Sequence, residues 1–131
     1  MKANIQNQEF IERLCEGNKL ITSPCISERE EIYLASYDGF IYKYKDENLI
    51  PLFEVGGQPN GLYVHNNIAY IADFGHQCIL AKSIVDKGNN LSQLVKDFEG
   101  NPLIGPNSLV VNSAGSNLKR FALFHRFWNT R

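Results

Sequence analysis

Two segments of the sequence recur in the same order along the chain. Tyr33–Ala35, which is followed by an Asp- and Gly-containing turn, returns 37 positions later as Tyr70–Ala72. Pro59–Val64 (PNGLYV) returns 47 positions later as Pro106–Val111 (PNSLVV), and Ser23–Ile26 is a weaker first copy. This spacing indicates one supersecondary unit stacked several times, because a single unit of about 40 residues cannot bury its own apolar faces.

Each unit is predicted to consist of short antiparallel strands. Runs rich in β-branched and aromatic residues alternate with Gly, Pro, Asn and Asp. Asp38-Gly39 is a hairpin signal because Gly adopts positive φ readily, and the side chains of Phe40–Tyr44 divide between two faces with a period of two residues. We expect strands at Leu20–Ile21, Glu31–Ser36, Gly39–Tyr44, Leu49–Val55, Gly61–His65, Ile68–Ala72, Cys78–Ser83, Leu91–Phe98 and Ser108–Asn112. The chain is therefore predicted to be all-β.

The repeat length matches that of a β-propeller blade, in which four strands occupy roughly 40–50 residues. We predict a partial β-propeller of about two and a half four-stranded blades over residues 20–115. A lead-in at residues 1–19 precedes the blades, and a divergent basic aromatic tail at residues 116–131 follows them. A generic β-sandwich with similar turns is the alternative. The propeller is favoured because two separate motifs repeat in the same order.

The charge balance argues against a general attraction to nucleic acid or to an anionic membrane. Thirteen basic residues stand against fourteen acidic ones, which gives a net charge of −1. Met1–Phe10 is polar, so we expect neither a secretory signal nor a transmembrane segment there. Cys15, Cys25 and Cys78 are odd in number and lack a C-x-x-C spacing, as is typical of free thiols in a reducing compartment. We therefore expect a cytoplasmic protein.

Two segments resemble a known family of six-bladed propellers. Gly57–Gly75 resembles a blade signature that many NHL-type propellers share. Asp97–Val111 (DFEGNPLIGPNSLVV) is more specific and resembles a segment of the senescence marker protein/gluconolactonase family, relatives of the strictosidine synthase-like and paraoxonase propellers. The resemblance covers Leu20 to Ser113. Six blades would need roughly 240–270 residues, so the resemblance implies an N-terminal fragment of such a ring.

The resemblance also implies a metal site and a reaction. Family members bind one divalent cation, usually calcium, at the centre of the ring, and many hydrolyse lactones, so a lactone or sugar-acid substrate is implied for a complete ring. Asn107 matches the asparagine of the family's Pro-Asn motif that faces the metal, and Asn60 is a weaker candidate ligand. The family's first ligand is a Glu, which Thr22-Ser23 replaces here. The remaining ligand and the catalytic Asp belong to later blades, so we expect the fragment alone to hold no metal and to be inactive.

Plainer interpretations stand beside these. Asn60 and Asn107 can be turn residues whose side chains bond their own backbone. Asp73 is interpreted as a blade-turn residue and His76 as a surface histidine without partners at metal-ligand spacing. The missing carboxylate at Thr22-Ser23 also favours a second function, that of a non-catalytic NHL-like or strictosidine synthase-like propeller used for binding.

The two ends depart from the repeat. Asn4–Glu16 has loosely spaced apolar residues and is predicted to be a short helix or a lead-in strand. The tail at residues 116–131 carries large apolar side chains at helical spacing, which is typical of a helix that lies on a membrane or docks on a partner; an incidental end is the plainer interpretation. Because the third blade would be unfinished, we also expect an exposed edge at Ser108–Asn112 that promotes self-association.

Overall fold

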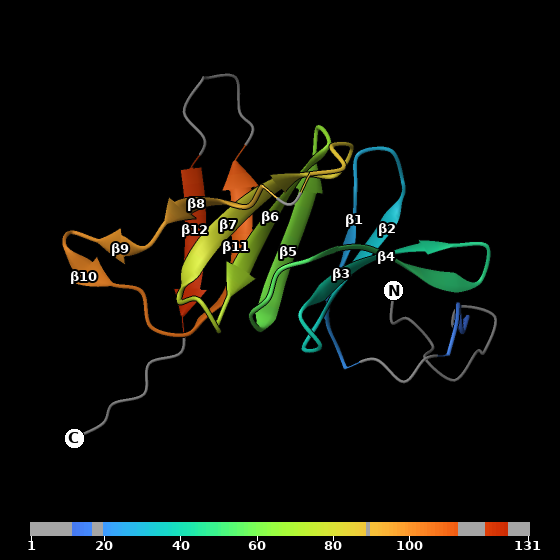
Figure 1. Cartoon of the computed structure of the whole chain (residues 1–131), viewed down its shortest axis with the longest axis horizontal. Coiled ribbons are helices and arrows are strands. Elements are labelled where there is room, and N and C mark those ends of the chain that lie inside the picture. The colour runs from blue at the N-terminus through green and yellow to red at the C-terminus, as the bar shows by residue number, and fades with distance from the viewer. Residues whose placement is uncertain (1–11, 17–19, 89, 113–119, 126–131) are drawn as a thin grey trace, which may run out of the picture.

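The computed structural model describes residues 12–16, 20–88, 90–112 and 120–125 of the chain. Every regular element among these residues is a β-strand, so the predicted all-β class is confirmed (Figure 1). Two four-stranded antiparallel sheets come first, and in each of them the strands follow chain order. Their strands are β1 (Ile21–Ile26), β2 (Ile32–Ser36), β3 (Phe40–Lys45) and β4 (Asn48–Glu54), then β5 (Pro59–His65), β6 (Ile68–Asp73), β7 (Cys78–Ser83) and β8 (Ser92–Val95).

Four further strands follow. β9 (Asp97–Phe98) and β10 (Asn101–Pro102) form a small hairpin that projects from the sheets at the left of Figure 1. β11 (Pro106–Asn112) and β12 (Arg120–His125) form an antiparallel pair, and β11 packs against β5 and β6. We call the sheets β1–β4, β5–β8 and β11–β12 blade 1, blade 2 and blade 3, and the first strand of each blade its inner strand.

Strands β5, β6 and β7 of blade 2 are largely buried on both faces. Along β6, Ala69 and Ile71 pack toward blade 1, whereas Tyr70 and Ala72 pack toward blade 3. The cluster between blades 1 and 2 (cluster 1–2) comprises Tyr33, Ala35, Ile41, Phe53, Val55, Leu62, Val64, Ala69, Ile71, Cys78 and Leu80. The cluster between blades 2 and 3 (cluster 2–3) comprises Tyr70, Ala72, Ile79, Ala81, Leu103, Leu109 and Val111. Stacking of blades, as the repeat predicted, therefore supplies the core.

The hairpins depend on residues that adopt positive φ. Asp46-Glu47 and Asn66-Asn67 are two-residue turns with φ between 49° and 63°, as the turn that matches the twist of a tight hairpin requires. Gly39 has φ 91°, and Asp38 Oδ1 accepts a hydrogen bond from the Phe40 nitrogen at 3.1 Å. The hairpin predicted at Asp38-Gly39 is confirmed.

The single strand predicted at Leu91–Phe98 is wrong. The chain is interrupted at Lys96, whose carbonyl accepts a hydrogen bond from the Leu103 nitrogen at 3.0 Å. Glu99 and Gly100, with φ 51° and 79°, then turn the chain back. The physical reason is the burial of Leu103 in cluster 2–3, which bends the segment into a separate hairpin.

The structure also corrects the predictions for the two ends. Residues 12–16 contain no helix, and the rest of the predicted element at Asn4–Glu16 lies outside the described residues. The helical interpretation of the tail is wrong for Arg120–His125, which form β12; residues 116–119 and 126–131 lie outside the described residues. β12 pairs with one edge of β11 as far as Asn112, so blade 3 has one strand more than we predicted. The predicted self-association through a blade edge stays a prediction. The described residues include no helix long and apolar enough to span a bilayer.

Candidate functional site

The three inner strands share one irregularity. In β1, β5 and β11 the pairing with the next strand shifts register between the first and third residues. The extra residue of this bulge is Thr22 in β1, Asn60 in β5 and Asn107 in β11. A β-bulge bends its strand and re-aims a side chain. The bulges therefore make these three residues equivalent positions in successive blades.

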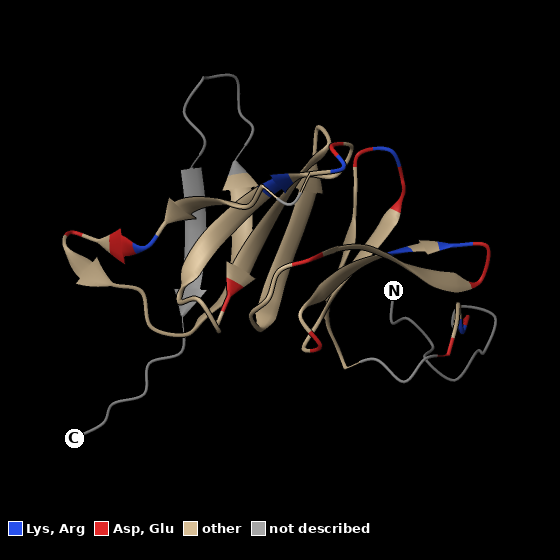
Figure 2. Ribbon diagram, viewed as in Figure 1, with Lys and Arg blue, Asp and Glu red and all other residues tan. Residues whose placement is uncertain are grey.

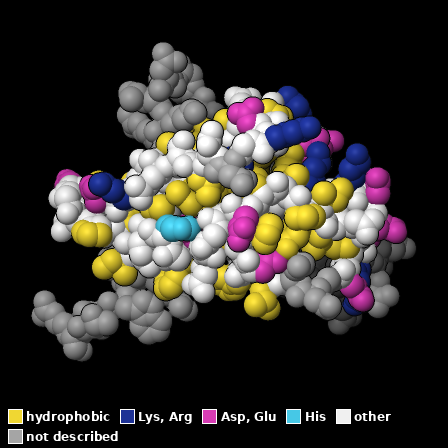
Figure 3. All heavy atoms as spheres, viewed as in Figure 1, with side chains coloured by type: hydrophobic (Ala, Val, Ile, Leu, Met, Phe, Trp, Pro, Cys, Tyr) yellow, Lys and Arg dark blue, Asp and Glu magenta, His cyan; other side chains and the backbone are white. Residues whose placement is uncertain are grey.

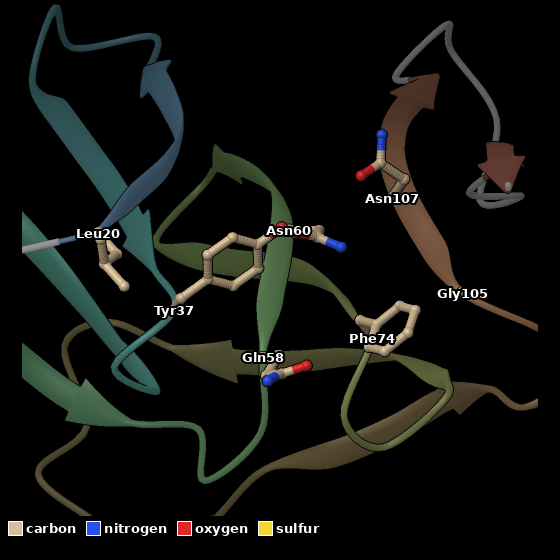
Figure 4. A pocket seen from close by; sticks show the side chains of 7 residues that line it. All are labelled: Leu20, Tyr37, Gln58, Asn60, Phe74, Gly105 and Asn107. Atoms are coloured by element: carbon tan, nitrogen blue, oxygen red, sulfur yellow. The ribbon is translucent and has the colours of Figure 1, made fainter.

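A pocket of about 510 Å³ opens at the end of the inner strands where the bulges lie (Figure 4). Its volume lies in the range of small-molecule sites. The lining residues are Leu20, Tyr37, Gln58, Asn60, Phe74, Gly105 and Asn107. The structure thus brings together the two asparagines that the sequence predicted. Their assignment as metal ligands stays a prediction.

The lining repeats from blade to blade. Leu20, Gln58 and Gly105 each precede an inner strand, and Tyr37 and Phe74 each begin the turn after the second strand of a blade. The Tyr37 nitrogen donates to the Leu20 carbonyl at 2.9 Å, and the Phe74 nitrogen donates to the Gln58 carbonyl at 3.0 Å. The same backbone bond therefore fixes both aromatic residues at the pocket.

A buried carboxylate holds the turn that carries Phe74. Asp73 is 0% exposed. Its Oδ1 accepts hydrogen bonds from the main-chain nitrogens of Gln58 at 2.6 Å and Gly75 at 3.1 Å, and its Oδ2 contacts His76 Nδ1. Hydrogen bonds to an ionised acceptor are stronger than neutral ones. Asp73 is thus a turn residue, as predicted, and His76 has a carboxylate partner that its sequence position did not reveal.

A close approach of two inner strands sets the spacing of Asn60 and Asn107. A Cβ at Gly61 would lie 2.9 Å from the Asn107 carbonyl oxygen and 3.1 Å from the Ala72 Cβ. A residue with a side chain would therefore push β11 away from β5. On the other flank of Phe74, Gln77 donates to the Phe74 carbonyl at 2.7 Å and accepts from the Gly105 nitrogen at 2.5 Å.

Thr22 does not line the pocket, although its bulge is equivalent to those of the two asparagines. Its hydroxyl donates to the Pro59 carbonyl at 2.8 Å, which ties blade 1 to the start of blade 2. Thr22, at the position where the sequence resemblance implies a Glu ligand, therefore takes part in a contact between blades.

No charged side chain lines the pocket among the residues that the structure describes. The inner strands contain no Lys, Arg, Asp or Glu, and charged residues lie mainly in the turns and outer strands (Figure 2). Among the described residues, no group of three or more His, Cys, Asp or Glu side chains is placed to hold a metal ion. Calcium takes six to eight oxygen ligands, usually with carboxylates among them. The asparagine amides supply oxygen donors, but the described residues do not by themselves fit a calcium site.

A second hollow, of about 180 Å³, lies beside Glu31. Glu31 accepts a hydrogen bond from the Tyr33 hydroxyl at 2.5 Å and pairs with Lys43 Nζ at 3.2 Å. The Tyr33 hydroxyl, followed by Lys43, holds the pKa of the Glu31 carboxyl below its usual value, whereas burial raises the pKa of Tyr33. Tyr33 is buried, whereas the Glu31 and Lys43 side chains are partly exposed. The network joins β2 to β3 within one blade.

Sequence reasoning missed most of the pocket. Leu20, Tyr37, Gln58 and Phe74 were not singled out as site residues. The available signal was their position: Tyr37 and Phe74 directly follow the two copies of the repeated strand. Tyr37 is 47% and Phe74 is 39% exposed, although both are aromatic and occupy equivalent positions in two copies of the repeat.

No family model matches the chain, and no curated protein sequence matches it. Solved structures do match. A protein provisionally described as a gluconolactonase, studied as a structural genomics target, has a TM-score of 0.64 and 18% sequence identity over 79% of this chain. The computationally designed Ika4 protein has a TM-score of 0.39 and 12% identity over 88% of this chain and 98% of its own.

The likeness to the first protein shows the fold. The chain spans 37% of the length of that protein. The predicted partial propeller of about two and a half blades is confirmed by the sheets β1–β4, β5–β8 and β11–β12. The chain therefore has the fold of part of a β-propeller.

Proposed function

We propose that this chain is part of a gluconolactonase-like propeller whose complete ring is a metal-dependent lactone hydrolase. The chain contributes the ligand-binding pocket formed by three successive blades. The repeated bulge supports this proposal most, because it directs Asn60 and Asn107 into one pocket at the same strand position. The proposed substrate is a lactone, and the proposed location is the cytoplasm.

The two asparagines can bind a cyclic ester without any charged group. An Asn NH2 donates to the carbonyl oxygen of the ester, and an Asn oxygen accepts from a hydroxyl group of the ligand. A donor that is held in place also stabilises the negative charge that develops on that oxygen during attack by water. Hydrolysis further needs a group that accepts a proton from the water, and no carboxylate or imidazole lines the described pocket. We therefore expect this chain alone to bind a lactone without turnover.

A substitution at the third bulge tests the proposal. Thr22→Glu places a carboxylate at the strand position equivalent to Asn60 and Asn107. We expect this variant to gain calcium binding with a Kd of about 1 mM, measured by calorimetry. Thr22→Gln is the control, because it has the same size and no charge, and it should bind no calcium.

The two further arms of this test concern specificity and turnover. Adding Asn107→Ala to Thr22→Glu should abolish the gained calcium binding. The unmodified chain should hydrolyse glucono-δ-lactone no faster than buffer, with or without calcium. Calcium binding that is equal in the Glu and Gln variants, or lactone turnover by the unmodified chain, would contradict the proposal.

A non-catalytic propeller used for binding is the second candidate. The hydrogen bond from Thr22 to the Pro59 carbonyl favours it, because that side chain holds two blades together and leaves no ligand at the family's Glu position. In this case a complete ring would bind its ligand with no dependence on calcium. Ligand affinity that is unchanged by a chelator, together with no lactone hydrolysis by a complete ring, would select this candidate.

A further inference from the structure

The pocket presents three kinds of surface to a ligand. Tyr37 and Phe74 supply aromatic rings, and Leu20 supplies an aliphatic side chain. Three amide side chains, those of Gln58, Asn60 and Asn107, supply hydrogen-bond donors and acceptors. Gly105 lines the pocket with its backbone. No ionisable group other than the Tyr37 phenol lines the pocket among the described residues. The surface is therefore aromatic and amide, with no fixed charge.

The two aromatic residues are exposed but fixed in position. Tyr37 is 47% and Phe74 is 39% exposed, so neither belongs to the core clusters. The main-chain N–H of each aromatic residue donates a hydrogen bond to the carbonyl of the residue that precedes an inner strand. Asp73 also fixes the turn that carries Phe74. Aromatic side chains held in advance give contact area to a ligand at a small entropic cost. In Figure 4 the Tyr37 ring extends toward Asn60, next to the polar part of the pocket.

We propose that this pocket binds an uncharged lactone with an aryl or alkyl face, and that Tyr37 and Phe74 determine this specificity. The proposal rests on the proposed function, because it names the substrate class of the same site. A polyhydroxylated sugar lactone would place hydroxyl groups against the aromatic rings and Leu20, where they would lose hydrogen bonds to water without a replacement. A sugar-acid anion would meet no Lys or Arg side chain in the described pocket.

The NH2 groups of the two asparagines match the acceptors of one ester group. A cyclic ester offers a carbonyl oxygen and a ring oxygen as acceptors, which the NH2 groups of Asn60 and Asn107 can satisfy. The remaining ring surface of an aryl lactone is apolar and suits the aromatic side chains, since such contacts contribute beyond the buried area. The pocket thus separates a polar side at the bulges from an apolar side at the turns.

An NMR titration of the full chain with stable probes tests the proposal. Hydrocarbostyril is an uncharged aryl lactam that keeps the shape of an aryl lactone and is not hydrolysed. We expect it to shift the side-chain amide signals of Gln58, Asn60 and Asn107 and to bind at least about tenfold more tightly than glucono-δ-lactone. Gluconate is the anionic probe and should cause no shift. Equal or tighter binding of glucono-δ-lactone, or shifts with gluconate, would overturn the proposal.

Substitutions of Tyr37 and Phe74 test whether these two aromatic rings determine the affinity for hydrocarbostyril. Phe74→Ser and Tyr37→Ser should each weaken hydrocarbostyril binding by roughly tenfold, whereas Phe74→Tyr and Tyr37→Phe should retain it. Phe74→Leu keeps an apolar side chain and should give an intermediate affinity, which preserves the test if a Ser variant does not fold. Phe98→Ser is the matched control, because Phe98 is 69% exposed on β9 and does not line the pocket. Equal affinities in the Ser variants and the control would overturn the assignment.

The outcomes separate this inference from the proposed function. If Thr22→Glu gains no calcium while hydrocarbostyril binds as expected, the metal-dependent hydrolase fails and the specificity stands. If Thr22→Glu gains calcium while glucono-δ-lactone is preferred, the specificity fails and the hydrolase stands.

Discussion

Asp73 is a fully buried carboxylate held by groups from two turns. Its oxygens face the main-chain nitrogens of Gln58 and Gly75 and the Nδ1 of His76. Gly57 packs over it so closely that a Cβ there would lie 2.7 Å from Asp73 Cγ and nearer still to both oxygens. The carboxylate cannot move aside without losing its hydrogen bonds. We expect Gly57→Ala to lower the free energy of unfolding by about 1–3 kcal/mol, measured by urea denaturation.

A second glycine provides the control for this substitution. Among the described residues, a Cβ at Gly88 would meet only the side-chain nitrogen of Asn90, at the ordinary contact distance of 3.8 Å. Gly88→Ala should therefore change the free energy of unfolding by less than about 0.5 kcal/mol. Equal losses in the free energy of unfolding in the two variants would show that the contact between Gly57 and Asp73 is not the cause of the destabilisation.

Glu31 gives the protein a specific response to acid. The Tyr33 hydroxyl and then Lys43 lower its pKa from 4.5 in the folded state. A carboxyl with a depressed folded pKa stabilises the fold above its unfolded pKa, and this contribution is lost as the pH falls through the folded pKa. We expect Glu31→Gln to reduce the fall in Tm between about pH 5 and about pH 3. Glu54→Gln, at the exposed end of β4, is the control and should keep the wild-type pH profile.

The sequence located these residues but could not assign their contacts. Asp73 was predicted at a blade turn because Asp and Gly recur there, and it lies at the end of β6. Its role as a buried acceptor depends on the approach of Gly57, which belongs to a different turn. The direction of the Thr22 hydroxyl is likewise set by the packing of blade 2 on blade 1. Contacts between repeats are not encoded in the pattern within one repeat.

At the scale of elements, the strands that flank tight turns were predicted most reliably. Most strands of blades 1 and 2 were predicted because two-residue turns and alternating side chains are local signals. The single strand predicted at Leu91–Phe98 was wrong because the burial of Leu103 in cluster 2–3 decides where this segment bends. Arg120–His125 form a strand because they pair with β11, and this pairing overrides the helical spacing of the apolar residues in the tail.

The outer strand of blade 1 carries its own protection against association. β4 pairs with β3 alone among the described strands, and Pro51 lies in it opposite Tyr42. A proline on an edge strand lacks the N–H that another strand would need. We expect Pro51→Thr to increase self-association, measured as a concentration-dependent rise in sedimentation coefficient. Ile50→Thr keeps the proline and should sediment like the wild type.

Exposed apolar side chains identify a second surface to monitor in that experiment. Figure 3 shows hydrophobic atoms on the projecting β9–β10 hairpin, where Phe98 is exposed. Association through this hairpin would be reduced by Phe98→Ser and would be insensitive to Pro51. Association that rises equally in the Pro51 and Ile50 variants would therefore contradict protection by the proline.

At the scale of the whole molecule, blade 2 links the other two blades. Side chains along β5, β6 and β7 alternate between cluster 1–2 and cluster 2–3, so these three strands contribute to both interfaces. Neither blade 1 nor blade 3 packs on the other in these clusters. The stability of the described fold therefore depends on one central sheet, as in repeat proteins whose units contact only their neighbours.

Ile71 and Ile79 test whether this central sheet couples the blades. Both side chains are fully buried in blade 2, Ile71 in cluster 1–2 and Ile79 in cluster 2–3. We expect Ile71→Ala and Ile79→Ala each to cost about 2–5 kcal/mol and each to speed hydrogen exchange in both β1 and β11. The reason is that either cavity weakens the same sheet, on which both inner strands pack. Faster exchange confined to β11 in Ile79→Ala would show that blade 3 unfolds independently, and that the pocket can lose Asn107 while blades 1 and 2 stay folded.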